Sequence, residues 1–208
     1  MQQGVLTLKQ QEVFKELKKF PDFYMVGGTA LALQIGHRKS VDFDLFREKP
    51  LDKAFFAKIY KVFKPHSLTI DFKHSEQTNI KVDGIKVHFV KYKYPLLFVL
   101  KKIEEVQFAS VEEIALMKAF AMGQRATLKD YVDLYFIIKE GFCSLDRIID
   151  YSEKKYRNEF SGGLFLEQLT FLEDVREIEE MPIDFLAEKV SRVQMKEFFE
   201  QEISKIKL

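Results

Sequence analysis

The window from Phe23 to Phe46, FYMVGGTALALQIGHRKSVDFDLF, changes its hydrophobic pattern twice and constrains the fold more than any other stretch. A short apolar run ends at Gly27-Gly28, and strong helix formers follow as far as Gly36. From Val41 to Leu45, apolar and acidic residues alternate strictly, which is the period of a half-buried strand. The window therefore predicts a strand, a glycine turn, a helix and a second strand, in that order.

Before Pro95, the pattern alternates between helical and extended segments. The expected elements are helices over 8–20 and 51–63 and extended segments over 68–72 and 80–90. Asp83-Gly84 separates two alternating runs within the last of these segments and predicts a tight hairpin turn. This part of the chain is therefore expected to form a small mixed sheet flanked by helices.

After Pro95, helical patterning dominates. Ser110 and Thr127 have capping-box spacing and predict helices that end near 122 and 139. Helical patterning continues to the carboxyl terminus and is interrupted at Gly141, Gly162-Gly163 and Pro182. We therefore predict an α+β chain with a mixed-sheet core over 1–94 and a helical region over 95–208 that packs on the core and completes its site.

Composition limits the classes of partner. The chain has 208 residues, of which 47% are hydrophobic, so it can bury a sizeable core. Its 33 Lys and Arg residues nearly balance 32 Asp and Glu residues, so a nucleic-acid partner must be recognised by a local patch. The single cysteine, Cys143, the lack of a secretory pattern and the short longest apolar run, from Pro95 to Leu100, lead us to expect a cytoplasmic protein without a membrane partner.

Asp42 and Asp44 are the candidate metal ligands. Residues two apart on a strand point to the same face, so these carboxylates should project together while Val41, Phe43 and Leu45 face the core. Two neighbouring carboxylates repel each other unless a cation lies between them, and Mg²⁺ or Mn²⁺ favours oxygen ligands that it can share with phosphates. The alternative is the solvated polar face of an edge strand.

The Gly27-Gly28 pair is the candidate phosphate site. Glycines at the start of a helix let the backbone approach a ligand, and the first helical amides point toward an anion. Thr29 adds a hydroxyl at the same place. A tight turn with Thr29 as a helix cap would explain the same residues. Next to two metal-binding carboxylates, however, this pattern is typical of a nucleoside triphosphate site.

The loop from Gly36 to Ser40 supplies further candidates for the nucleotide. Arg38 has a planar fork that can hold two phosphate oxygens, and we expect it over the triphosphate. Lys39 either contacts the triphosphate as well or lies in a solvated part of the loop. His37 is expected to have a structural role in the loop. Ser40 is expected at the turn and is counted with Arg38 among the nucleotide-binding residues.

These residues resemble the AbiEii/AbiGii-type nucleotidyltransferases, many of which are toxins of bacterial toxin-antitoxin systems, within the DNA polymerase β-like superfamily. The stretch VGGTALALQIGHRKSVDFDLF is similar to the family's opening motif, and VEEIALMKAFAMGQRATLKDYVDLYFIIK, over 111–139, is similar to its later helical motif. The resemblance covers residues 23 to 139. It implies a nucleotidyltransferase fold in which Asp42 and Asp44 bind metal and the Gly27-Gly28-Thr29 turn holds phosphates.

The later motif places Lys118, Arg125, Lys129, Asp130 and Asp133 in matching positions. The spacing of the three basic residues is compatible with one cluster that faces the nucleotide. The two aspartates either orient those bases or lie against the catalytic sheet. Ion pairs between packed helices would explain the same residues without catalysis.

The chain departs from the family pattern at His88. Members of the superfamily commonly carry a third carboxylate on a strand after the hairpin, where this chain reads Lys86-Val87-His88-Phe89. The alternation sets His88 opposite the apolar residues, so we expect it to face the carboxylates. It then acts as a general base, as a metal ligand or as a structural histidine, with Asp71 as the next candidate for the missing acid.

The leading interpretation is a metal-dependent enzyme that moves a nucleoside monophosphate from a nucleoside triphosphate to an acceptor hydroxyl. The acceptor is an RNA, often tRNA in this family, or a protein side chain. The resemblance also implies an antitoxin partner. The alternative, prompted by His88, is a nucleotide-binding or partner-binding module that kept the fold after losing the chemistry.

Overall fold

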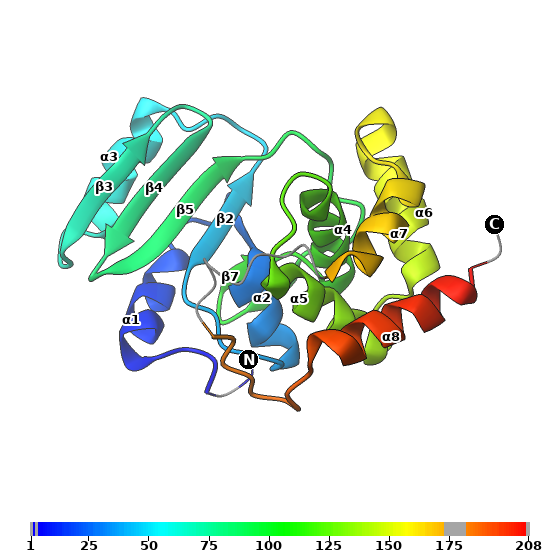
Figure 1. Cartoon of the computed structure of the whole chain (residues 1–208). Coiled ribbons are helices and arrows are strands. Elements are labelled where there is room, and N and C mark those ends of the chain that lie inside the picture. Colours follow the sequence, from blue (N-terminus) through cyan, green and yellow to red (C-terminus); the bar gives the residue numbers. More distant parts are fainter. Residues whose placement is uncertain (1, 3, 173–181, 207–208) are drawn as a thin grey trace. The chain divides into compact units, whose positions relative to one another are not determined.

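The computed structural model describes residues 2, 4–172 and 182–206 (Figure 1). The chain forms two compact units. The first contains residues 1–94 and 99–109, and the second contains residues 95–98 and 110–208. The expectation that only helices follow Pro95 is wrong, because two strands between residues 101 and 108 join the sheet of the first unit.

The first unit contains a seven-stranded mixed sheet of order β3-β4-β5-β2-β1-β7-β6 among the described residues (Figure 1). Its strands are β1 (Tyr24–Val26), β2 (Phe43–Arg47), β3 (Leu68–Lys73), β4 (Gln77–Val82), β5 (Ile85–Lys91), β6 (Lys101–Ile103) and β7 (Val106–Phe108). Its helices are α1 (Leu8–Leu17), α2 (Gly27–Ile35) and α3 (Lys53–Val62). The central strand β2 pairs antiparallel with β1 and parallel with β5, so both edges of β2 are occupied.

Phenylalanine rings bury one face of this sheet. The ring of Phe89 on β5 lies 5.1 Å from the rings of Phe20, Phe23 and Phe55. All four side chains are buried, and burial of one such side chain contributes about 1.5–3 kcal/mol. Because Val87 and Phe89 face this core, the intervening His88 must face the opposite side of the sheet.

The strand predicted over Val41–Leu45 begins two residues later than expected. Val41 is 55% exposed, so its expected place in the core is wrong, and Asp42 precedes β2. Gln10 donates from its side chain to the carbonyls of Ser40 and Val41, and the hydroxyl of Thr29 donates to the carbonyl of Asp42. These carbonyls therefore accept hydrogen bonds from side chains rather than from the backbone amides of a neighbouring strand.

Two hairpins of the sheet, β4–β5 and β6–β7, differ in whether the sequence predicts their turns. Asp83 and Gly84 form the predicted two-residue turn between β4 and β5, with φ of 52° and 84°. The β6–β7 turn uses Glu104 and Glu105, with φ of 46° and 68°. Non-glycine residues rarely adopt this left-handed region, and Glu is not among the usual turn residues. This explains why sequence patterning predicts the first hairpin and misses the second.

The second unit is helical, as predicted. Its helices are α4 (Val111–Met122), α5 (Leu128–Lys139), α6 (Leu145–Tyr156), α7 (Gly162–Thr170) and α8 (Arg192–Ser204), with a short 3-10 helix over Arg157–Glu159. The helical patterning predicted between Leu172 and Pro182 lies outside the described residues. Among the helices of the described part, none is long and apolar enough to cross a bilayer.

A buried ion pair ties three segments of the second unit together. Ser110 caps α4 by accepting a hydrogen bond from the Glu113 amide, but the Glu113 carboxylate does not return to complete the expected capping box. It accepts hydrogen bonds from the amides of Leu97 and Phe98, at 2.9 and 3.1 Å, and pairs with Lys155 of α6. Both charged side chains are 0% exposed, and burial lowers the pKa of Lys155.

We expect Lys155→Met to destabilise the protein by about 3–5 kcal/mol, because it leaves the Glu113 carboxylate buried without its cation. The double variant Glu113→Gln/Lys155→Met should recover most of this loss, since a neutral amide still accepts the two backbone hydrogen bonds. Urea unfolding measures the difference. The exposed neighbour Lys154→Met is the control, and equal stability of Lys154→Met and Lys155→Met would contradict a structural role for the pair.

Candidate active site

Asp44 and His88 are neighbours across the pair formed by β2 and β5. The parallel register sets them opposite each other, and His88 Nδ1 lies 2.9 Å from Asp44 Oδ1. The His88 side chain is 28% exposed and the Asp44 side chain is 31% exposed, so a ligand can reach the pair. The prediction that His88 faces the carboxylates is confirmed. The hydrogen bond to Asp44 raises the pKa of His88, and the charges of Asp44 and Asp42 add to this effect against the cost of desolvation.

Asp42 is held beside this pair by its backbone. Thr29, which is 0% exposed, donates its hydroxyl to the Asp42 carbonyl at 2.5 Å. The hydroxyl expected to bind phosphate is therefore used to fix the segment that leads into β2. The Asp42 side chain is half-buried, and its charge contributes to the raised pKa of His88 after the larger effect of Asp44. Both carboxylates thus act on one imidazole.

The glycine pair allows side chains to lie directly on the backbone at the start of α2. Gly27 has a φ of 72°, and a Cβ there would collide with the Asp44 carboxylate. A Cβ on Gly28 would collide with the Arg38 guanidinium and would lie 3.2 Å from Ser40 Oγ. The two glycines are the first residues of α2 rather than a turn before it, and no side chain caps this helix. The start of α2 therefore has no side-chain cap, and uncapped helix starts favour anions.

The loop over 36–40 folds against this helix start. Arg38 is 3% exposed, and its Nη1 donates to the Lys39 carbonyl at 2.9 Å. The Arg38 side chain is therefore buried and is not solvated. His37 is 1% exposed, in agreement with the structural role expected for it. Arg38 and Ser40 consequently meet at Gly28, next to the carboxylates.

The predicted residues of the second unit form an ion-pair network between α4 and α5. Lys118 Nζ lies 2.7 Å from an oxygen of Asp130 and 2.7 Å from an oxygen of Asp133. Asp133 is fully buried, while Arg125 is exposed in the loop after α4 and Lys129 is half-buried on α5. The structure thus joins Lys118 to the two aspartates, which agrees both with aspartates that orient this base and with an ion pair between packed helices.

The donor set at Asp42 and Asp44 suits a hard divalent cation. Among the described residues, no three Asp, Glu, His or Cys side chains are grouped to hold a metal by themselves. A cation at the two carboxylates would complete its coordination with water and phosphate oxygens, as Mg²⁺ commonly does. The residues present therefore fit a cation that arrives with a nucleotide.

Asp71 cannot replace the missing acid. It lies on β3 and forms an ion pair with Lys81 at 2.8 Å. Since β3 is separated from β2 by β4 and β5, and neighbouring strands are about 4.8 Å apart, the two strands are about 14 Å apart. His88 is left as the side chain at the position of the third carboxylate.

One residue that positions the site was missed in the sequence. Gln10 is 2% exposed and holds the carbonyls of Ser40 and Val41 ahead of Asp42. The sequence could have indicated this role through the position of Gln10, which lies on the buried face of α1 with Val13, Phe14 and Leu17. A polar residue on an apolar helix face requires a hydrogen-bond partner.

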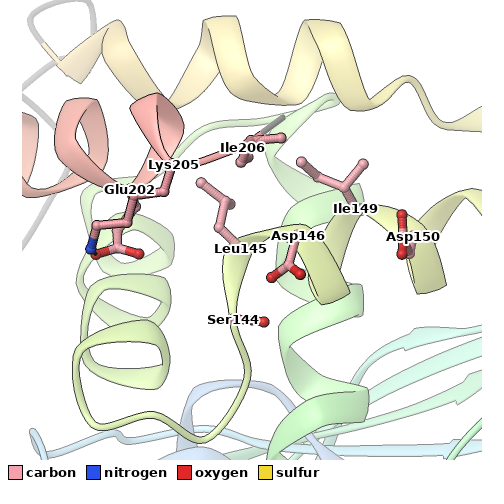
Figure 2. Close-up of a pocket in the computed structure, with 8 residues that line it drawn as sticks. All are labelled: Ser144, Leu145, Asp146, Ile149, Asp150, Glu202, Lys205 and Ile206. Carbon is pink, nitrogen blue, oxygen red and sulfur yellow. Dashed lines mark hydrogen bonds and ion pairs between the residues drawn. The ribbon is translucent and has the colours of Figure 1, made fainter. Parts of the chain in front are cut away.

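Two pockets in the described part of the second unit contain no predicted site residue. A pocket of about 600 Å³ lies between the start of α6 and the end of α8 (Figure 2). Its lining consists of Ser144, Leu145, Asp146, Ile149, Asp150, Glu202, Lys205 and Ile206. Lys205 is paired with Glu202 at 2.6 Å. A second pocket, of about 400 Å³, lies beside α7.

Comparisons with known proteins show which fold the chain has. The structure of JHP933 from Helicobacter pylori matches 96% of this chain and 94% of its own chain with a TM-score of 0.58 at 17% identity. MenT4, a nucleotidyltransferase toxin from Mycobacterium tuberculosis H37Rv, matches with a TM-score of 0.59 at 12% identity over 96% of this chain and 83% of its own. The protein has the fold of the nucleotidyltransferases.

The family model described as nucleotidyl transferase AbiEii toxin of a type IV toxin-antitoxin system matches residues 11–207. The chain belongs to this family, and the protein is a nucleotidyltransferase. The uncharacterized protein aq_aa25 of Aquifex aeolicus (strain VF5) is 36% identical over 160 residues, which are 75% of this chain and 76% of that protein.

We expect Gly28→Ala to weaken the binding of a nonhydrolysable triphosphate analogue, because the added Cβ displaces Arg38 and Ser40. Hydrogen bonds to charged groups contribute about 1.5–3 kcal/mol, so the loss should be about tenfold to a hundredfold. Gly123→Ala is the control, since its Cβ meets only a carbonyl at an ordinary 3.6 Å. Calorimetric titration measures both variants, and an unchanged affinity for Gly28→Ala would make the glycine pair a structural feature only.

Proposed function

We propose that this nucleotidyltransferase transfers a nucleoside monophosphate from a nucleoside triphosphate to an acceptor hydroxyl with the aid of a divalent cation. The observation that carries the proposal is the Asp44–His88 pair beside the open start of α2. The acceptor oxygen forms a bond to the α-phosphorus, and the bond from that phosphorus to the pyrophosphate oxygen breaks. The protein then has to hold phosphates, accept one proton and balance the charge that develops.

The phosphates are proposed to bind at the start of α2. The backbone of Gly27 and Gly28 is open to close approach, and the helix terminus favours an anion. Arg38 supplies a fixed cation, and its burial against Gly28 keeps its guanidinium oriented before the nucleotide arrives. Asp42 and Asp44 would hold Mg²⁺ or Mn²⁺, which would neutralise phosphate charge in the transition state.

His88 is proposed to accept the proton of the attacking hydroxyl. When Nδ1 carries the hydrogen bonded to Asp44, Nε2 is the nitrogen that can accept. The hydrogen bond to Asp44 then orients the ring and fixes the tautomer in which Nε2 accepts the proton. This assigns His88 the task of the third carboxylate that the family pattern leads one to expect.

The later family motif adds residues to the proposal. Arg125 and Lys129 are proposed to contact the nucleotide, and Lys118 with Asp130 is proposed to fix the start of α5 that carries Lys129. Thr127 supports this role, because its hydroxyl lies 2.7 Å from the same Asp130 carboxylate. The proposed reaction is located in the cytoplasm, with RNA, including tRNA, or a protein as the acceptor, and an antitoxin as the partner of the toxin.

A module that binds nucleotide without transferring it is the second candidate, and the observation that favours it is the His88 imidazole at the expected carboxylate position. Incubation with labelled nucleotides, Mg²⁺ or Mn²⁺, and total RNA or cell lysate separates the two candidates. Label on a macromolecule supports the enzyme, and binding without transfer supports the module.

Asp42→Asn and Asp44→Asn are expected to abolish transfer and to leave the fold intact, because each change removes a ligand charge from a partly exposed site. Loss of carboxylate repulsion can slightly stabilise the metal-free protein. Initial rates and thermal unfolding are measured together. Glu48→Gln, an exposed carboxylate just beyond β2, is the control, and a doubly substituted protein that still transfers nucleotide would refute the site.

His88→Ala is expected to lower single-turnover transfer by about a hundredfold, which is typical for loss of a general base. If the imidazole instead binds the cation, the wild type prefers Mn²⁺ and His88→Asp shifts the preference toward Mg²⁺. His66→Ala is the control, because His66 also bonds an aspartate, Asp83, at 2.6 Å. Equal rates for wild type and both His88 variants with each metal would show that His88 takes no part.

A further inference from the structure

Aromatic side chains lie beside the Asp44–His88 pair on the same face of the sheet. Phe46 follows Asp44 by two residues on β2, so both side chains project to the same face, about 6.6 Å apart along the strand. The strand registers set Phe46 opposite Tyr24 of β1 and Val90 of β5. A row of uncharged side chains therefore runs parallel to the row that contains Asp44 and His88.

Tyr92 joins this row from the segment that follows β5. Its amide donates to the Arg47 carbonyl at 2.7 Å, so the pairing of β2 with β5 continues one residue beyond Lys91. The centroid of the Tyr92 ring lies 4.9 Å from that of Phe46. The Tyr24 ring meets Phe46 edge-on, with centroids 6.5 Å apart and an interplanar angle of 71°. Tyr24, Phe46 and Tyr92 are called the open-face rings below.

The open-face rings are held at one end and partly exposed at the other. Tyr24 is 7% exposed, whereas Phe46 and Tyr92 are half-buried. On the opposite face of β2, Phe43 and Leu45 are 0% and 1% exposed, so that face is core. A ligand can therefore reach two of the three rings, and contacts among the rings fix their positions before it arrives.

An uncharged aromatic surface beside a phosphate site matches the two parts of a nucleoside triphosphate. The triphosphate is an anion, and it is proposed to bind at the start of α2, where Gly27 directly follows β1. The base is a flat, uncharged ring, and aromatic side chains bind such rings by stacking, whichever base is present. The step of two residues from Asp44 to Phe46 matches the separation that a ribose places between the α-phosphate and the base.

We propose that the open-face rings stack the base of the donor nucleoside triphosphate. The inference rests on the proposed function and names the residues that bind the nucleoside rather than the phosphates. Two of the rings belong to β1 and β2, which are the strand that leads into α2 and the strand that carries Asp44. All three rings lie in the first unit, together with both of these parts of the site.

A base fits the open-face rings better than an anion or a protein surface does. The rings and the neighbouring Val90 carry no charge, so they offer no cation to a phosphate. A stable protein interface covers about 800 Å² on each partner, far more than two half-buried rings supply. Stacking of a base requires only the face of one ring.

The test is calorimetric titration of the full chain, in the presence of Mg²⁺, with two kinds of ligand. One is the tightest-binding α,β-methylene analogue of the four common ribonucleoside triphosphates, and the other is inorganic tripolyphosphate, which lacks the base. Phe46→Leu should weaken binding of the analogue by about tenfold, which is typical for loss of one stacked base, and should leave tripolyphosphate binding unchanged. Tyr92→Leu should do the same, and its position beyond the end of β5 makes it the variant that disturbs the sheet less.

Tyr60→Leu and Phe72→Leu are the matched controls. Their rings are 52% and 48% exposed on α3 and on the edge strand β3, away from β1 and β2 in the sheet order. Both variants should bind both ligands as the wild type does. Thermal unfolding of all four variants gives the folded fraction, and tripolyphosphate binding reports on the phosphate site in each of them.

The pattern across the two ligands separates this inference from the proposed function. A loss confined to the analogue in the Phe46 or Tyr92 variant supports the inference. Unchanged affinity in both of these variants, or an equal loss for both ligands, overturns it, and transfer of label by the wild type then leaves the proposed function standing. Base-dependent binding by a wild type that transfers no label supports the open-face rings and overturns transfer. A wild type that binds neither ligand overturns both.

Discussion

The close contact between the Asp44 carboxylate and the backbone of Gly27 is the constraint on which the site depends. Any side chain at Gly27 would occupy the position of that carboxylate, and the backbone there adopts a φ of 72° that favours glycine. Thr29, two residues later, fixes the carbonyl of Asp42. One short helix start thus contacts the Asp44 carboxylate and fixes the backbone of Asp42.

Alternate residues of β2 and β5 have different roles: one set packs in the core and the other set forms the site. Phe43, Leu45 and Phe89 face the aromatic core, whereas Asp44 and His88 face the open side. A slip of one residue in the pairing would bury the charged pair and expose the rings, so the register is strongly specified by the hydrophobic pattern. The core therefore holds the site geometry without contributing a side chain to it.

The sequence predicts the parts of the structure that depend on residues close together in the chain. The Asp83-Gly84 turn and the orientation of His88 follow from turn chemistry and strand period, and both are confirmed. The late start of β2 could not be predicted, because it depends on hydrogen bonds from residues distant in sequence, such as Gln10. The β6–β7 turn lacks the usual turn residues, and the Glu113–Lys155 pair joins helices that no local pattern connects.

The fate of the triphosphate tests the central claim most directly. Two parallel reactions contain the full chain, total RNA and a divalent cation, and differ only in whether the triphosphate is labelled at the α-phosphorus or at the γ-phosphorus. Nucleotidyl transfer at the Asp44–His88 site predicts that the α-label appears on the acceptor and the γ-label in pyrophosphate. Appearance of the γ-label on the acceptor would show transfer of the terminal phosphate and would contradict the account.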